Sequence, residues 1–205
     1  MTDEREQSSK SKSTVARDRA VAAPPCAMVI FGAAGDLTKR LVVPALYNLV
    51  TAGRLAKGFQ LVGFDLAAKT TDEWRQGLTE MMQEFASKGG GEFEVDHIDD
   101  AAWRWLTDRM TYLQGDLNDP GAFQRLGKHL ADLDKSNGTA GNHLFYLAVA
   151  DRFFSLAVAG LGAAGLVTEK DGHWRRVVIE KPFGHDLASA KALNAEILKL
   201  SLIHI

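Results

Sequence analysis

The stretch "VIFGAAGDLTKR", residues 29–40, decides the fold class of this chain. A short apolar run leads into a turn of small residues, and the pattern that follows is helical. Gly32 and Gly35 would let backbone N–H groups approach a ligand closely, and a helix N-terminus adds positive potential. Together these features favour a phosphate-binding turn between a buried strand and a helix.

The turn differs from the common dinucleotide-binding pattern G-x-G-x-x-G. Its sequence is G-A-A-G-D-L, in which Ala34 and Leu37 stand where the second and third glycines would be. A simpler interpretation stays open at this point, namely a tight strand-to-helix connection with Asp36 as an ordinary helix cap. The turn is not a Walker loop, because no Gly-Lys-Ser/Thr closes it.

Outside this stretch, short apolar runs alternate with longer amphipathic segments. That alternation predicts an α/β fold, a Rossmann-like, doubly wound, mainly parallel sheet with helices on both faces. The expected strands are 27–32, 59–65, 110–116, 142–150 and 174–182, and the expected helices are 36–53, 70–88, 99–109, 119–136, 152–165 and 186–200. Pro44 lies inside the first expected helix, so we expect a kink or a break there.

Composition excludes several classes of function. The chain has 205 residues, 46% of them hydrophobic, and 24 basic against 26 acidic side chains give a net charge of -2. No broad positive field is therefore available to gather nucleic acid or an anionic membrane surface. The His and Cys residues show no metal-site spacing, and Cys26 alone cannot form an internal disulfide, so we expect a reducing, cytoplasmic compartment.

The first 25 residues differ in character from the rest of the chain. They are polar, end in Pro-Pro and lack the continuous apolar run of a signal peptide or membrane span. We expect a disordered tail over residues 1–25 and one dinucleotide-binding domain over residues 26–205.

A second signature, "VVIEKPFGHDL", covers residues 177–187. Lys181 would follow a parallel strand, beside the crevice where open α/β sheets bind ligands, and could touch a substrate and a cofactor together. A cis peptide bond at Pro182 would fix the direction of Lys181. The alternative is a solvated lysine in a turn before a helix capped by Asp186.

Four segments in this order resemble the N-terminal coenzyme domain of the glucose-6-phosphate dehydrogenase family. They are "VIFGAAGDLTKRLVVPALYNL", "YLQGDLNDPGAFQRLG", "NHLFYLAVA" and "VVIEKPFGHDLASAKALN". The resemblance implies oxidation of D-glucose 6-phosphate to 6-phospho-D-glucono-1,5-lactone, the first step of the pentose phosphate pathway. Hydride would pass from the sugar C1 to the nicotinamide of NADP.

The resemblance also implies roles for individual residues. The coenzyme turn would consist of Gly32, Ala33, Gly35, Asp36 and Leu37. Two residues would lie near the adenosine half, Asp116 and Leu117. Tyr146 would approach the dinucleotide from the central strand, and Lys181 would contact both the coenzyme and the sugar phosphate.

One departure from the family concerns the choice of coenzyme. The family usually has an arginine in a G-x-x-R pattern after the second strand, which holds the 2′-phosphate of NADP, whereas this chain has "GFDL" at residues 63–66. Asp65 suits a free ribose hydroxyl and would repel a 2′-phosphate, so NAD becomes possible. The alternative is that Asp65 faces solvent and another cation supplies the missing charge. The candidates for that cation are Lys39, Arg40 and Lys69.

A second departure concerns catalysis. The family's general base is the histidine of an R-I-D-H-Y-L-G-K motif, which these 205 residues do not contain, and His204 lacks the neighbouring residues of that motif. We therefore expect no catalytic residue here and no second domain, through which the full-length form would associate into a homo-oligomer. The 205-residue chain alone should not oxidise glucose 6-phosphate.

Two other classes of function remain as alternatives. Dehydrogenases similar to inositol and glucose-fructose oxidoreductases also place E-K-P after a strand, but they normally have a G-x-G-x-x-G-type turn. A non-catalytic module that binds a coenzyme and regulates partners is the other alternative.

Overall fold

The computed structural model describes residues 21–88, 97–181, 186–199 and 203–204. Six parallel strands form one sheet in the order β3-β2-β1-β4-β5-β6. The strands are β1 (Ala27–Phe31), β2 (Gln60–Asp65), β3 (Met110–Gln114), β4 (His143–Leu147), β5 (Arg175–Ile179) and β6 (Ile203–His204). The helices are α1 (Val43–Thr51), α2 (Thr71–Lys88), α3 (Asp100–Thr107), α4 (Pro120–Asn137), α5 (Phe154–Ala163) and α6 (Leu187–Lys199). The predicted doubly wound α/β fold is confirmed.

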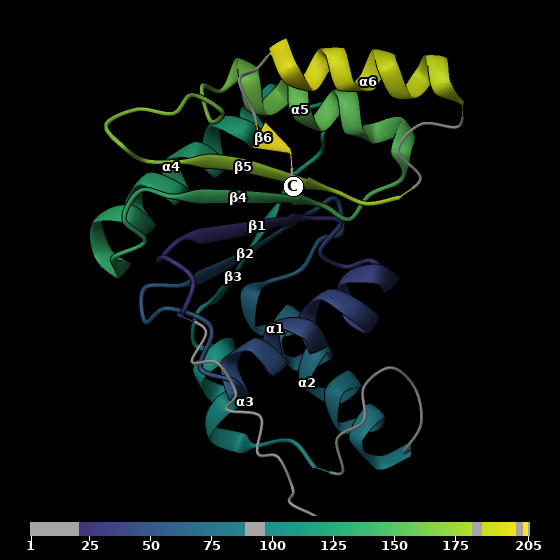
Figure 1. Cartoon of the computed structure of the whole chain (residues 1–205). Helices are drawn as coiled ribbons and strands as arrows, with labels where there is room; N and C mark the ends of the chain where they lie inside the picture. The colour runs from purple at the N-terminus through teal and green to yellow at the C-terminus, as the bar shows by residue number, and fades with distance from the viewer. Residues whose placement is uncertain (1–20, 89–96, 182–185, 200–202, 205) are drawn as a thin grey trace, which may run out of the picture.

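Helices cover both faces of the sheet, as Figure 1 shows, with α1, α2 and α3 on one side and α4, α5 and α6 on the other. Successive residues of a strand point to opposite faces, so β1 supplies Val29 and Phe31 to one layer and Met28 and Ile30 to the other. All five residues of β1 are buried, which is typical of a central strand in a parallel sheet.

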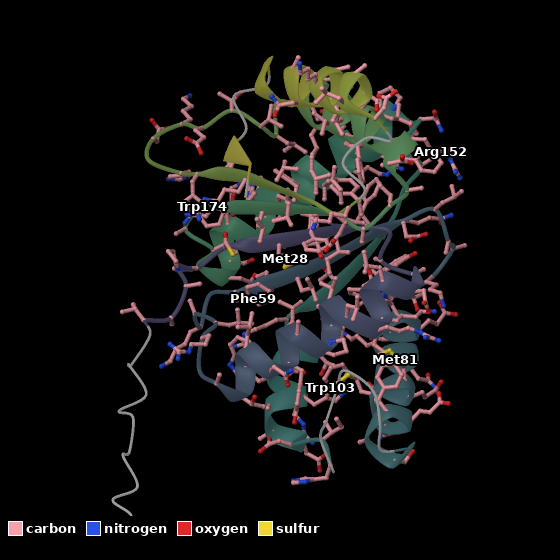
Figure 2. All side chains as sticks on the ribbon, turned by 45° about the vertical axis from the view of Figure 1, so that its right-hand side comes forward. Met28, Phe59, Met81, Trp103, Arg152 and Trp174 are labelled. Carbon is pink, nitrogen blue, oxygen red and sulfur yellow. The ribbon has the colours of Figure 1, made fainter. Side chains whose placement is uncertain are left out.

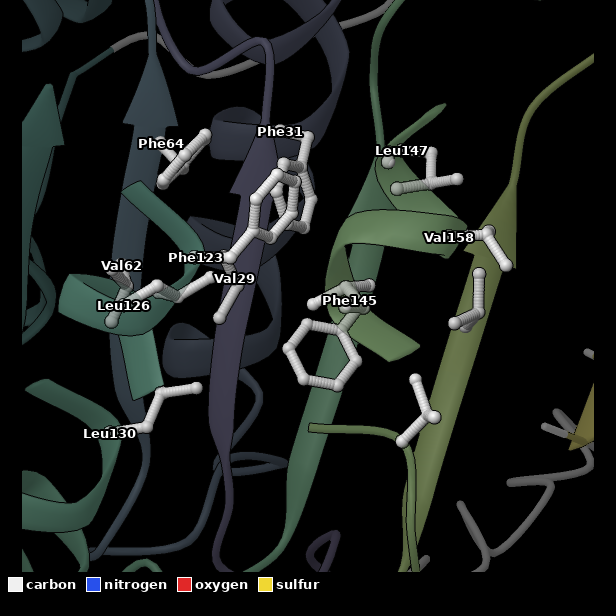
Figure 3. Packing of buried hydrophobic residues seen from close by; sticks show 14 of the residues in the cluster. Val29, Phe31, Val62, Phe64, Phe123, Leu126, Leu130, Phe145, Leu147 and Val158 are labelled. Atoms are coloured by element: carbon white, nitrogen blue, oxygen red, sulfur yellow. The ribbon is translucent and has the colours of Figure 1, made fainter. Parts of the chain in front are cut away.

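Phenylalanine rings lie among aliphatic side chains in the layer between the sheet and helices α4 and α5 (Figure 3). The ring centroid of Phe31 lies 5.0 Å from that of Phe64 and 6.2 Å from that of Phe123. Such aromatic pairs add to the stability that the burial of their area provides. Because Phe31 directly precedes Gly32, this packing anchors the end of β1 from which the turn departs.

The helix that follows the turn changes its hydrogen bonding before Pro44. It starts at Asp36 and widens into a π-helical turn over Thr38–Val42, in which the N–H of Val43 donates to the carbonyl of Thr38. Pro44 has no N–H for the carbonyl four residues earlier, so a regular α-helix cannot run through it. The helical backbone continues through Pro44 without interruption, so no break occurs there; the hydrogen bonding changes to the π form just before it, and α1 begins at Val43.

Side chains cap two of the helices as their sequences predict. At α2 the hydroxyl of Thr70 accepts from the N–H of Glu73 at 3.2 Å, and the Glu73 carboxylate accepts from the N–H of Thr70 at 2.6 Å. This reciprocal pair is a capping box, which makes Thr70 the cap of α2. At α4 the Asp119 carboxylate accepts from the N–H of Gly121 at 2.8 Å, with Pro120 as the first helical residue.

The ends of the chain are described only in part. Residues 1–20 of the predicted tail and Pro182 lie outside the described residues. The remaining tail residues form no helix or strand, although the N–H of Ala23 donates to the carbonyl of Arg54 at 2.9 Å. The short strand β6, which contains His204, is an element that the sequence did not predict. None of the helices in the described segments is long and apolar enough to cross a membrane.

Candidate functional site

The turn after β1 can be made only by a glycine at its first position. Gly32 has a φ of +86°, and a Cβ placed on it would lie 2.3 Å from the carbonyl oxygen of Ala148, just beyond β4. Its N–H donates to the carbonyl of Phe64 at 3.0 Å, which fixes the turn against the end of β2. The turn at the end of β1 therefore packs closely against the carboxyl ends of both neighbouring strands, β2 and β4.

The same turn closes on the start of a helix. The carbonyl of Gly32 accepts from the N–H of Gly35 at 3.0 Å and from the hydroxyl of Thr38 at 2.9 Å. The first helical N–H groups lie at this turn, where the helix dipole is positive and a phosphate binds well. Asp36 is exposed and its carboxylate lies 2.9 Å from Nε of Arg40.

Ala33 anchors the turn to the core. Its side chain is fully buried, and its carbonyl accepts from the indole N–H of Trp74 at 3.0 Å. A Cβ on Gly63 would lie only 2.9 Å from the Cβ of Ala33, so β2 approaches the turn too closely for a side chain at position 63. Leu37 packs half-buried against the same layer. Ala33 and Leu37 thus hold the shape of the turn from beneath.

Asp65, at the end of β2, is bonded to the turn through its side chain. Its Oδ2 accepts from the N–H of Ala34 at 2.9 Å, and its Oδ1 accepts from the N–H of Ala67 at 3.0 Å. The residue is half-buried. The alternative in which Asp65 simply faces solvent is therefore wrong, because both carboxylate oxygens have backbone partners at the edge of the sheet.

A pocket of about 270 Å³ opens beside Asp65 at the carboxyl ends of β1, β2 and β3. Its lining residues are Phe31, Gly32, Phe64, Asp65, Leu66, Gly115, Asp116, Leu117, Asn118, Val149 and Phe153. Hydrogen bonds from the backbone and side-chain N–H groups of Asn118 hold the pKa of Asp116 below its usual range. The pocket thus brings together Gly32, Asp65, Asp116 and Leu117 from the predicted site and places a charged carboxylate at its rim.

Tyr146 and Lys181 lie at a different part of the same edge. The phenol of Tyr146, on β4, donates to the carboxylate of Glu180, directly after β5. Burial, together with this bond and the charge of Glu180, raises the pKa of Tyr146, so the phenol stays protonated. Lys181 follows Glu180 and is exposed. Neither Tyr146 nor Lys181 lines the pocket beside Asp65.

A larger, apolar groove of about 540 Å³ lies between α1 and the β4–β5 part of the sheet. Figure 2 shows three of its lining residues, Met28, Phe59 and Trp174, on one side of the sheet. The ring of Tyr146 belongs to this groove, whose floor also includes Arg176, with its guanidinium carbon 4.5 Å from the centroid of the Trp174 ring.

Sequence reasoning assigned no site role to several residues at this edge. Glu180 was visible as the acid of E-K-P, but its bond to Tyr146 depends on the pairing of β4 with β5. Phe153 lies in a short 3₁₀ turn, Asp151–Phe153, which takes up the start of the expected helix 152–165. Asn118 could have been found from its place after Asp116, because the pair forms a local turn.

Comparison with known proteins identifies the family. Residues 29–201 match the family described as "Glucose-6-phosphate dehydrogenase, NAD binding domain". The chain belongs to the glucose-6-phosphate dehydrogenase family. It is 40% identical over 172 residues to "Glucose-6-phosphate 1-dehydrogenase 2" of Mycobacterium tuberculosis, an alignment that covers 84% of this chain and 32% of that protein.

Solved structures of this family have the same fold. Glucose-6-phosphate 1-dehydrogenase from Mycobacterium avium superposes with a TM-score of 0.70 and 28% identity, covering 89% of this chain and 36% of that one. A glucose-6-phosphate dehydrogenase in complex with its substrate glucose-6-phosphate gives a TM-score of 0.73 at 25% identity, over 90% of this chain and 37% of that one. This chain thus spans about a third of the length of the glucose-6-phosphate dehydrogenases it matches.

Proposed function

We propose that this chain is the coenzyme-binding part of an enzyme that oxidises D-glucose 6-phosphate to 6-phospho-D-glucono-1,5-lactone. The observation that carries the proposal is the turn at Gly32. It leaves no room for a Cβ, and it ends on a helix N-terminus at the carboxyl edge of a parallel sheet. Open α/β sheets bind dinucleotides at this edge, where the strand order reverses between β1 and β4.

The residues present fit a nicotinamide dinucleotide. Gly32, Gly35 and the first turn of the helix would hold the pyrophosphate, and Asp65, Asp116 and Leu117 would surround the adenosine half. The resemblance in sequence implies NADP, whereas Asp65 opens the site to NAD. When bound, the nicotinamide ring supplies the hydride acceptor for the sugar C1.

We assign the sugar phosphate side to the ends of β4 and β5. Lys181 is exposed there, and an ammonium at this position can attract a phosphate and a sugar oxygen. The bond between Tyr146 and Glu180 holds the acid beside Lys181 against β4, which fixes where the chain reaches Lys181. In this proposal Tyr146 acts by positioning Lys181 near the dinucleotide.

The proposal extends to the setting of the full-length protein. We propose a homo-oligomer that forms through the part of the relatives that this chain does not span. A reducing, cytoplasmic compartment is consistent with Cys26, because burial raises the pKa of its thiol to about 11 and keeps it unreactive.

A chimera tests the activity. Residues 29–201 would replace the matching segment of the Mycobacterium tuberculosis relative, and reduction of NAD or NADP would be followed by absorbance after glucose 6-phosphate is added. We expect turnover by the chimera, none by the 205-residue chain alone, and a large loss in a Lys181→Ala chimera. A folded, oligomeric chimera that binds coenzyme but never oxidises the sugar phosphate would contradict the proposal.

A further inference from the structure

The pocket beside the turn carries negative charge where the adenosine ribose would lie. Asp65 and Asp116 both line it, and none of its lining residues is Lys or Arg. The backbone of Ala34 and Ala67 holds the Asp65 carboxylate in place, with oxygen–nitrogen distances of 2.9 and 3.0 Å. Asp116 is held by Asn118 in a similar way. Neither carboxylate needs to move to meet a ligand.

These carboxylates distinguish two coenzymes that differ only at the ribose 2′ position. Each oxygen of Asp65 accepts one backbone hydrogen bond and has a second lone pair, so it can accept from a free 2′-hydroxyl. A 2′-phosphate offers no such donor and brings up to two negative charges. Like charges a few ångströms apart at a protein surface weaken binding by about tenfold or more.

None of the three cations that could supply the missing charge, Lys39, Arg40 and Lys69, lines this pocket. Arg40 pairs with Asp36 at 2.9 Å, on the helix after the turn. Arg152 places its guanidinium carbon 4.7 Å from the ring centroid of Phe153, which lines the pocket, but Arg152 itself does not. Lys69 is exposed and is not a lining residue either.

We propose that Asp65 makes this site selective for NAD over NADP, with Asp116 adding to the exclusion of the 2′-phosphate. The proposal rests on the proposed function, since it assumes that a nicotinamide dinucleotide occupies the edge of the sheet. The Asp65 carboxylate then has two roles, because it accepts a hydrogen bond from the N–H of Ala34 in the turn and one from the ribose 2′-hydroxyl.

Titration of the 205-residue chain with NAD and with NADP, followed by calorimetry, tests this selectivity. We expect NAD to bind at least about tenfold more tightly than NADP at low ionic strength, with a smaller ratio at high salt because salt screens the repulsion. NADP binding as tightly as NAD, or more tightly, would overturn the proposal and leave the proposed function standing. If neither coenzyme binds, the proposed function itself fails.

Variants of Asp65 and of the neighbouring Leu66 test whether Asp65 causes the selectivity. Asp65→Asn should bring the ratio of the two affinities close to one, and adding Leu66→Arg should reverse it. The matched control is Asp132→Asn, which removes the same charge from an exposed position late in α4, near the amino ends of the strands. Equal ratios in Asp65→Asn and Asp132→Asn would refute the assignment.

A further variant covers the case in which Asp65→Asn does not fold. Leu66 is 65% exposed, so Leu66→Arg alone should fold normally. It places a cation at the lining of the pocket and should raise the affinity for NADP several-fold, and more than it changes the affinity for NAD. An unchanged NADP affinity in this folded variant would count against a 2′-phosphate site at Asp65.

Discussion

Replacing Gly32 with alanine should damage the turn more than an ordinary glycine substitution does. Two costs add at this position. A φ of +86° is strained for any residue with a Cβ, and that Cβ would lie 2.3 Å from the carbonyl oxygen of Ala148. The neighbouring bond from the N–H of Ala148 to the carbonyl of Phe31, 2.9 Å long, would have to shift as well.

The magnitude follows from these two costs. The backbone strain amounts to roughly 1–2 kcal/mol. Overpacking against a fixed neighbour adds roughly 1–3 kcal/mol. Gly32→Ala should therefore lower the free energy of unfolding by about 3 kcal/mol. Gly53 is the matched control, because its φ is +65° and nothing lies within 4 Å of an added Cβ, so Gly53→Ala should show the strain alone.

Urea unfolding followed by tryptophan fluorescence measures both variants. The free energy of unfolding of Gly32→Ala should be lower than that of Gly53→Ala by about 1–3 kcal/mol, which is the overpacking contribution. Gly32→Ala should also lose coenzyme binding under conditions where it is still folded, whereas Gly53→Ala should bind normally. Equal losses of stability in the two variants would refute the argument that the turn is closed against β4.

Three other expectations concern the frame around the site. Burial lowers the pKa of His143 from its usual 6.5 to about 4, despite the Asp134 carboxylate beside it. Between pH 6.5 and pH 4 this histidine is therefore protonated in the unfolded chain but not in the folded one. The free energy of unfolding should fall by about 3 kcal/mol between pH 6.5 and pH 4, and His143→Gln should reduce that fall. Trp74→Phe removes the donor to the buried carbonyl of Ala33. It should lower the free energy of unfolding by about 1–3 kcal/mol and weaken coenzyme binding. An unchanged urea midpoint together with an unchanged coenzyme affinity would count against this contact. Asp99→Ala removes the cap of α3. It should lower the free energy of unfolding by about 1 kcal/mol while the coenzyme affinity stays the same.

Local patterns were enough to predict the fold class and the elements other than β6 and the 3₁₀ turn Asp151–Phe153. The apolar run before Gly32 and the helix that starts at Asp119–Pro120 each depend on neighbours within a few residues. A change in the helix near Pro44 was predictable for the same reason, since proline removes a donor that the helix needs. Its π-helical form, with the helix unbroken, was not predicted.

The contacts within the site could not be read from local patterns. Asp65 and Ala34 are 31 residues apart, and Tyr146 and Glu180 are 34 apart. These pairs meet because strand order and register bring the carboxyl ends of β1, β2, β4 and β5 to one edge. The sequence placed Asp65 at the end of β2, but its two backbone partners became visible only in the folded chain.

Amide chemical shifts of the ¹⁵N-labelled 205-residue chain during titration with NAD test the central claim most directly, which is that a dinucleotide binds across the turn. We expect the largest changes at residues 32–37, at Asp65 and at Asp116. Changes confined to the apolar groove around Trp174, or no changes at saturating NAD and NADP, would show that no dinucleotide binds across the turn.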